Sequence, residues 1–183
     1  MSYPPLVVRV LLVLIVITAA FFDYRQRRVP NWLSLTGVLT GVGLNYFLDQ
    51  PPTDLWNSLK GFGVAFVIYF VLYLLRAMGA GDVKLMAAVG AIVGLWNWIG
   101  ILVLTSIFGG VAAIVLVSKT GRVRSTFRNI WTILRSLTHR QAPYESNPEL
   151  DVRNEQAVRL PHAVTIAFGA MGFLIAAYIW APR

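Results

Sequence analysis

Residues 85–118 read LMAAVGAIVGLWNWIGILVLTSIFGGVAAIVLVS, a run of 34 residues without a charged side chain. As one α-helix this run would extend about 51 Å, whereas the hydrocarbon core of a bilayer is about 30 Å thick. We therefore expect two membrane-spanning helices, at about 82–97 and 99–118, joined by a turn near residues 96–98. Divided in two, the uncharged run gives each helix about 16 residues, or about 24 Å, which is short for the bilayer and places Asp82 at the membrane edge or beyond it.

Four further apolar segments have the length and composition of membrane spans, and they lie at about residues 6–22, 30–48, 61–78 and 161–181. The second of them opens with a proline followed by Asn31, a pair suited to a helix start, and we expect Asn31 to act as a cap. Residues 49–60 should form a loop with a short interfacial turn around Trp56. The sequence thus predicts an all-α polytopic membrane protein, a single domain with six transmembrane helices.

The overall composition excludes several classes of protein. Of the 183 residues, 57% are hydrophobic and only 13% are charged, about half the charged fraction of a soluble domain. The net charge of +8 comes from basic residues that flank apolar runs, so it indicates membrane topology and no nucleic-acid partner. With no cysteine and only two histidines, thiol chemistry and Cys- or His-rich metal sites are excluded, and we expect no metal or cofactor.

The distribution of Lys and Arg predicts the orientation in the membrane. Thirteen of the sixteen basic residues follow the first, third and fifth spans, so this side should be cytoplasmic and both termini periplasmic. The polar segment 119–160 is then a cytoplasmic loop, with a short amphipathic helix at about 131–137 lying on the membrane. We interpret residues 6–22 as a membrane span and not as a cleaved signal peptide, because their basic cluster follows the apolar stretch instead of preceding it.

Two of the eight acidic residues lie at span ends. Asp23 ends the first span and Asp82 begins the fourth, which places both on the predicted cytoplasmic side. Burying a carboxylate there costs several kcal/mol unless a partner or a function offsets the cost. Each could be an interfacial residue paired with Arg25, Arg28 or Lys84. Alternatively the two form a catalytic pair, because carboxyl groups that share a proton supply both a general base and a general acid.

Two glycines, Gly79 and Gly81, precede Asp82 in a Gly-Ala-Gly-Asp sequence. Their lack of side chains would let an extended substrate backbone approach the carboxylate. The other interpretation is a flexible turn in which Asp82 caps a helix, and both interpretations are compatible. Lys84 and Arg25 are candidates for tuning the two carboxylates or for contacting lipid phosphate.

Three ordered motifs carry a family resemblance. Asp23 is followed by a basic stretch and Val-Pro-Asn at 29–31, Gly-Ala-Gly-Asp-Val-Lys occupies 79–84, and Leu-Pro-His-Ala-Val at 160–164 opens the last span. This set, which covers almost the whole chain, resembles the type IV prepilin peptidases, GxGD aspartyl proteases of the bacterial inner membrane. The resemblance implies that Asp23 and Asp82 are the catalytic pair. It also implies a prepilin substrate with a short basic leader, cut at the cytoplasmic face after a glycine that precedes an apolar helix.

The chain departs from the large bifunctional members of that family. It lacks their N-terminal domain with a paired-cysteine metal motif, so N-methylation is left open and the chain looks like the short tight-adherence (Flp pilus) subgroup. Partners are then the prepilin and membrane lipids, with homo-oligomerisation left open.

Since a helix N-terminus favours a carboxylate and a C-terminus disfavours one, we expect Asp82 rather than Asp23 to be the base. His162 is expected at the interface without a catalytic role, and Trp96 and Trp98 as interfacial anchors.

Two other functions remain open from the sequence. In a small proton-coupled transporter, intramembrane carboxylates would relay protons, but such a relay needs acids at several depths and the centres of these spans contain none. A non-catalytic scaffold for pilus assembly would keep the fold without hydrolysis. Asp-to-Asn substitutions separate these alternatives, since only the enzyme loses processing.

Overall fold

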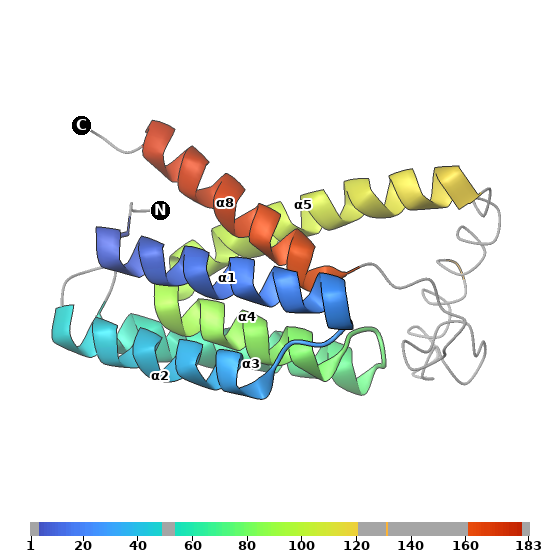
Figure 1. The fold of residues 1–183 in the computed structure, drawn as a ribbon. Coiled ribbons are helices and arrows are strands. Elements are labelled where there is room, and N and C mark those ends of the chain that lie inside the picture. The colour runs from blue at the N-terminus through green and yellow to red at the C-terminus, as the bar shows by residue number, and fades with distance from the viewer. Residues whose placement is uncertain (1–3, 49–53, 121–130, 132–160, 181–183) are drawn as a thin grey trace.

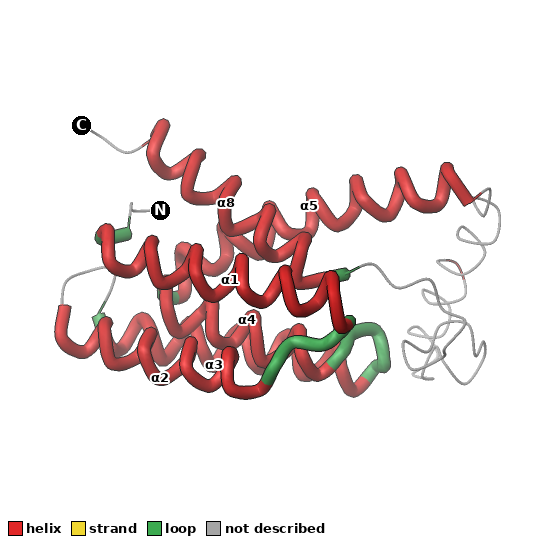
Figure 2. Tube along the Cα trace, in the orientation of Figure 1, coloured by secondary structure: helices red, strands yellow, loops and turns green. Residues whose placement is uncertain are grey.

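The fold is built from long helices, as the apolar runs predict. The computed structural model describes residues 4–48, 54–120, 131 and 161–180, and no strand occurs within them (Figure 2). Its helices are α1 (Leu6–Gln26), α2 (Asn31–Leu48), α3 (Leu55–Leu74), α4 (Ala80–Val93), α5 (Leu95–Thr120) and α8 (His162–Trp180) (Figure 1). The predicted all-α class is therefore confirmed.

Four of these helices, α1, α3, α5 and α8, are long and apolar enough to cross a membrane. Helix α4 has only 14 residues, which span about 21 Å against a hydrocarbon core of about 30 Å. Helix α2 has 18 residues, among them Ser34, Thr36, Thr40 and Asn45. The described part of the chain thus has the helices of a multi-pass membrane protein, and four of the six expected spans meet the length and composition of a membrane helix.

Helix α3 starts earlier than the sequence predicts. It begins at Leu55 with Asp54 at its N-cap, so the turn expected around Trp56 is the first turn of the helix. Residues 55–60 of the expected loop are therefore helical, and residues 49–53 lie outside the described part of the chain. Most of the predicted loop 119–160, including its amphipathic helix at 131–137, lies outside the described residues.

The break between α4 and α5 also differs from the prediction. It falls at Gly94, whose φ of 77° suits a residue without a side chain, and not at residues 96–98. Asn97 and Trp98 are therefore in the first turns of α5, where both are buried. Trp98 is fully buried, so its predicted role as an interfacial anchor is wrong; its ring is part of the core. Trp96 is exposed.

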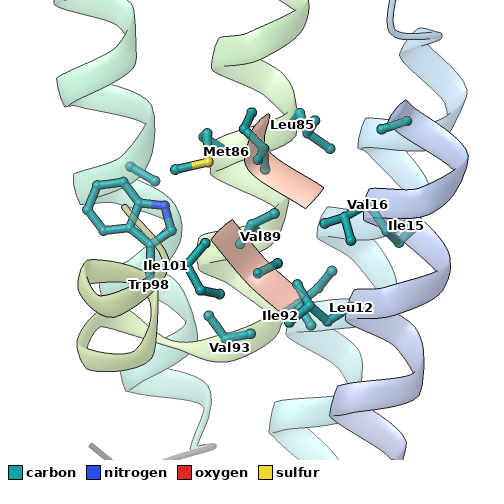
Figure 3. Packing of buried hydrophobic residues seen from close by; sticks show 14 of the residues in the cluster. Leu12, Ile15, Val16, Leu85, Met86, Val89, Ile92, Val93, Trp98 and Ile101 are labelled. Carbon is teal, nitrogen blue, oxygen red and sulfur yellow. The ribbon is translucent and has the colours of Figure 1, made fainter. Parts of the chain in front are cut away.

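Helix α4 is the centre of the bundle. Every residue from Leu85 to Val93 is buried, and its apolar side chains pack against Leu12, Ile15 and Val16 of α1 on one side. On another side they meet Trp98 and Ile101 of α5 (Figure 3). A helix that is apolar all round belongs in such a position, surrounded by other helices.

Two glycines let α3 and α4 approach one another closely. A Cβ atom added to Gly61 would overlap the backbone of Gly90 and Gly94, and one added to Gly90 would overlap the backbone of Gly61. Small residues at a helix contact are typical of membrane proteins, where packing and not hydrophobicity drives association. This contact holds α4 against α3, the helix with which it packs most extensively.

Candidate active site

Asp23 is in the last turn of α1 and Asp82 in the first turn of α4. The end of α1 and the starts of α4 and α8 lie at one end of the bundle (Figure 1). The connections α1–α2 and α3–α4 are at this same end. Helix α1 begins, and α8 ends, at the opposite end (Figure 1). The alternation of the helices thus brings together residues from the beginning, middle and end of the chain.

Asp23 lies in the last turn of α1 and is 9% exposed. Its Oδ2 accepts a hydrogen bond of 2.9 Å from the backbone N–H of Ala163, one of the first residues of α8. The first N–H groups of a helix have no partner within the helix. The carboxylate of Asp23 therefore caps α8 from a different part of the chain.

Asp82 occupies the third position of α4 and is half-buried. Its Oδ2 accepts a hydrogen bond of 3.3 Å from the backbone N–H of Gly79, the reciprocal bond of a capping box. The carboxyl group of Asp82 interacts electrostatically with that of Asp23. The two acidic side chains therefore lie within electrostatic range of one another, and each is held by a backbone N–H group at the start of a different helix.

Each carboxyl group keeps one oxygen available. Oδ2 is engaged in both residues, whereas Oδ1 of neither Asp23 nor Asp82 has a hydrogen bond to the described part of the protein. An ionised carboxylate has about four acceptor positions. The free oxygens can therefore bind a water molecule or, when protonated, donate to a substrate carbonyl.

The bend between α1 and α2 packs against the glycine-rich turn before α4. A Cβ atom on Gly81 would lie 3.3 Å from Cβ and 3.6 Å from the backbone N of Val29. Beside this contact, Lys84 Nζ donates a hydrogen bond of 2.9 Å to Asn31 Oδ1. The Val-Pro-Asn and Gly-Ala-Gly-Asp-Val-Lys motifs are thus neighbours. The side chain of Asn31 binds Lys84, a contact that was not predicted from the sequence, where Asn31 was expected to cap a helix.

The basic residues next to the aspartates do not neutralise them. Arg25 is exposed, and its guanidinium carbon lies 5.9 Å from the centre of the Phe21 ring. Neither Asp23 nor Asp82 forms an ion pair with a described residue. The interpretation of the aspartates as surface ion-pair partners of Arg25, Arg28 or Lys84 is therefore wrong for the described part of the chain.

The structure adds Tyr69 and His162 to the site. The rings of Tyr69, from the buried face of α3, and His162 have centroids 6.5 Å apart, and both residues interact electrostatically with Asp82. The sequence placed His162 at the interface, although its position next to the Pro-led start of the last span was a usable signal. Tyr69 had no such signal, because an aromatic residue in an apolar run is usually a core residue.

The helix-dipole argument for the base does not separate the two aspartates. Asp82 lies at the N-terminus of α4 as expected. Asp23 lies near the C-terminus of α1, but its carboxylate is bound at the N-terminus of α8, so both aspartates are held at a helix N-terminus. The described residues also contain no cluster of three or more His, Asp or Glu side chains suited to a metal ion.

Comparisons with known proteins agree with the motifs. Residues 10–114 match the model of the type IV leader peptidase family. The chain is 30% identical over 101 residues to a prepilin leader peptidase/N-methyltransferase of Escherichia coli, covering 52% of this chain and 44% of that protein. It is 28% identical over 124 residues to a protein of the same name from Myxococcus xanthus, covering 64% and 36%. The chain thus spans less than half the length of these curated relatives. No solved structure gives a significant match.

Proposed function

The chain belongs to the type IV leader peptidase family, and from this premise we propose that it is a membrane-embedded aspartic endopeptidase. Asp23 and Asp82 are its catalytic pair. The observation that carries this proposal is that two carboxyl groups lie within electrostatic range of one another, each bound through Oδ2 to a backbone N–H group and neither with a hydrogen bond from a described residue to Oδ1.

In the proposed reaction, one carboxylate takes a proton from a water molecule bound between the two aspartates. The water oxygen attacks the carbonyl carbon of the scissile peptide bond while the second, protonated carboxyl group donates a hydrogen bond to the carbonyl oxygen. Collapse of the tetrahedral intermediate transfers a proton to the leaving amine and breaks the C–N bond. Because the two groups titrate as a pair, the assignment of base and acid belongs to the pair as a whole.

The proposed substrate is a Flp-like type IV prepilin, whose short basic leader is cut after a glycine that precedes an apolar helix. The names of the two relatives describe them as prepilin leader peptidases, which supports this substrate class. The positive charge of the leader would hold the cleavage site at the cytoplasmic face of the inner membrane. We accordingly place the ends of α1 and the starts of α4 and α8 at that face, and both termini outside.

The positions of Gly79 and Gly81 support access of a substrate backbone to Asp82. A Cβ atom on Gly79 would lie 3.4 Å from Asp82 Oδ2, so a side chain there would stand beside the carboxylate. Gly81 also packs on Val29, which gives it a structural role as well. Lys84 and Arg25 would contact lipid phosphate or tune the two carboxylates. The exposure of both side chains is compatible with the lipid contact.

A proton-coupled transporter is the alternative that the same carboxylates could serve. Both aspartates lie at one end of the bundle (Figure 1), and no acidic residue lies in the middle of a described helix. A relay of protons across the membrane would lack intermediate stations. A catalytically inactive scaffold would have the same fold but would not cleave prepilin. The cleavage experiment described next distinguishes it from the enzyme.

The test uses the full chain, co-reconstituted in liposomes with a model prepilin that has a Lys-rich leader ending in glycine before an apolar helix. Asp23→Asn and Asp82→Asn should each lower cleavage by about 100- to 10,000-fold, with the new N-terminus read by mass spectrometry. Asp54→Asn is the matched control, because Asp54 precedes α3 at the other end of the bundle (Figure 1). Near-normal cleavage by either single variant at the site would refute the two-carboxylate mechanism.

A further inference from the structure

His162 has an imidazole nitrogen that is buried at the site and unused. Its Nε2 is inaccessible to solvent and has no hydrogen-bond partner among the described residues. Buried polar atoms nearly always have a partner, so an exception calls for an explanation. The neighbours of the ring indicate what that partner is.

The other ring nitrogen, Nδ1, is already engaged. It lies 3.2 Å from Thr165 Oγ1, and the Thr165 hydroxyl donates a hydrogen bond of 2.7 Å to the backbone carbonyl of His162. A hydroxyl group has one proton to donate, so its oxygen is the acceptor for Nδ1–H. This network assigns the proton of the neutral imidazole to Nδ1 and leaves Nε2 as an acceptor with an open lone pair.

The position of His162 connects it to both aspartates. The imidazole interacts electrostatically with Asp82, and the next residue, Ala163, donates its backbone N–H to Asp23. Tyr69 bounds the ring on the side of α3. The start of α8 therefore binds one aspartate through its backbone, and its imidazole lies within electrostatic range of the other.

We propose that His162 is a positioning residue of this site, whose Nε2 accepts a hydrogen bond from one water molecule that donates its other proton to the Asp82 carboxylate. This inference rests on the proposed function. The bridging water orients the Asp82 carboxyl group toward the water that attacks the substrate. Thr165 holds the ring in the required tautomer, as the second hydrogen bond of a functional histidine commonly does.

The side chains of Gln and Asn separate this role from a structural one. Gln places its amide near the position of Nε2, whereas Asn places it near Nδ1 and retains the contact with Thr165. If His162 positions Asp82, His162→Phe and His162→Asn should lower kcat for the model prepilin by about 10- to 100-fold with little change in KM, and His162→Gln should recover most of it. Val164→Ala, a change in the same turn of α8, serves as the control for local packing.

Three results would overturn the proposal. They are a wild-type kcat for a folded His162→Phe variant, rescue by Asn instead of Gln, and an effect confined to KM. Asp82→Asn is measured in the same assay, so that the two proposals are told apart. If Asp82→Asn cleaves normally, the proposed function fails; if it is inactive while His162→Phe is normal, only the role of His162 fails.

A second measurement needs neither substrate nor a folded Phe variant. The chain has two histidines, so His139→Gln leaves His162 as the single source of imidazole signals in ¹⁵N nuclear magnetic resonance of the protein in detergent. We expect the tautomer protonated at Nδ1 and a shift of the Nε2 resonance on Asp82→Asn, but none on Asp54→Asn. If Asp82→Asn does not shift the Nε2 resonance, the proposed hydrogen bond is contradicted.

Discussion

The carboxylate of Asp23 accepts the backbone N–H of Ala163 over 2.9 Å, across 140 positions of sequence. This bond ties the end of α1 to the start of α8. It gives Asp23 a structural task besides the catalytic one we propose, since it satisfies a helix N–H group that would otherwise be buried without a partner. Substitutions at Asp23 can therefore separate the two tasks.

Asp23→Asn should retain the fold and Asp23→Ala should weaken it. The amide oxygen of Asn can still accept the N–H of Ala163, whereas Ala leaves that donor unsatisfied, at a cost of about 1–2 kcal/mol. Thermal unfolding in a mild detergent would measure the difference, with both variants inactive in cleavage. Equal unfolding temperatures for the two variants would show that the bond to α8 contributes nothing.

Gly81→Ala distinguishes a packing role from a substrate-access role. The added methyl group would lie 3.3 Å from Val29 Cβ, so the bend after α1 must move and we expect cleavage to fall about tenfold or more. If packing is the cause, the double variant Gly81→Ala/Val29→Gly should recover activity, because it removes the Val29 Cβ that the new methyl group would meet. If the glycine is needed for access of the substrate backbone, the double variant stays impaired, and cleavage assays on both variants decide between the two.

Gly61→Ala and Gly63→Ala lie two positions apart on α3 and should behave in opposite ways. A methyl group on Gly61 would meet the backbone at 2.8 Å from Gly94 C and 2.9 Å from Leu95 N, whereas nothing lies within 4 Å of a Cβ on Gly63. We expect Gly61→Ala to destabilise the protein by about 1–3 kcal/mol. Gly63→Ala should be neutral or stabilise by up to about 1 kcal/mol, because alanine favours a helix. Unfolding in detergent measures both, and similar values would contradict the close contact of α3 and α4.

The sequence predicted the gathering of the two aspartates because that depends only on counting spans. When successive helices alternate in direction, the end of the first and the start of the fourth lie on the same side. The contact between Asp23 and Ala163 depends instead on the rotation and depth of α8 against α1. The rotation and depth of a helix are set by side-chain packing and cannot be predicted from a hydropathy pattern.

The errors have a similar origin. Trp98 was expected at the interface, because tryptophans often lie there, and only the arrangement of α4 and α5 puts its ring in the core. The break at Gly94 was visible as a glycine, but the neighbouring polar Asn97 made residues 96–98 look like the turn. From the sequence we expect no catalytic role for His162, because the two aspartates already supply both proton functions. Its proximity to Asp82 and Tyr69 depends on how three helices pack.

The end of α4 remote from Asp82 is bound by side chains from two other helices. Asn45 Nδ2 donates to the carbonyls of Ala91 and Ile92 over 3.0 and 3.1 Å, and Ser58 Oγ donates to the carbonyl of Ala91 over 2.6 Å. The last carbonyls of a helix have no partner within it. The hydrogen bonds from Asn45 and Ser58, both buried, give these carbonyl groups a partner inside the bundle.

The shared carbonyl of Ala91 makes the two substitutions interdependent. Ser58→Ala alone should cost little, because Asn45 still binds that carbonyl, and Asn45→Ala should cost about 1–3 kcal/mol. The double variant should be destabilised by more than the sum, since the carbonyl of Ala91 then has neither donor. Thr40→Ala, which removes a hydroxyl bonded only within α2, is the control with an effect near zero. Unfolding of the four variants in detergent gives the comparison, and strict additivity would mean that Asn45 and Ser58 stabilise α4 independently of each other.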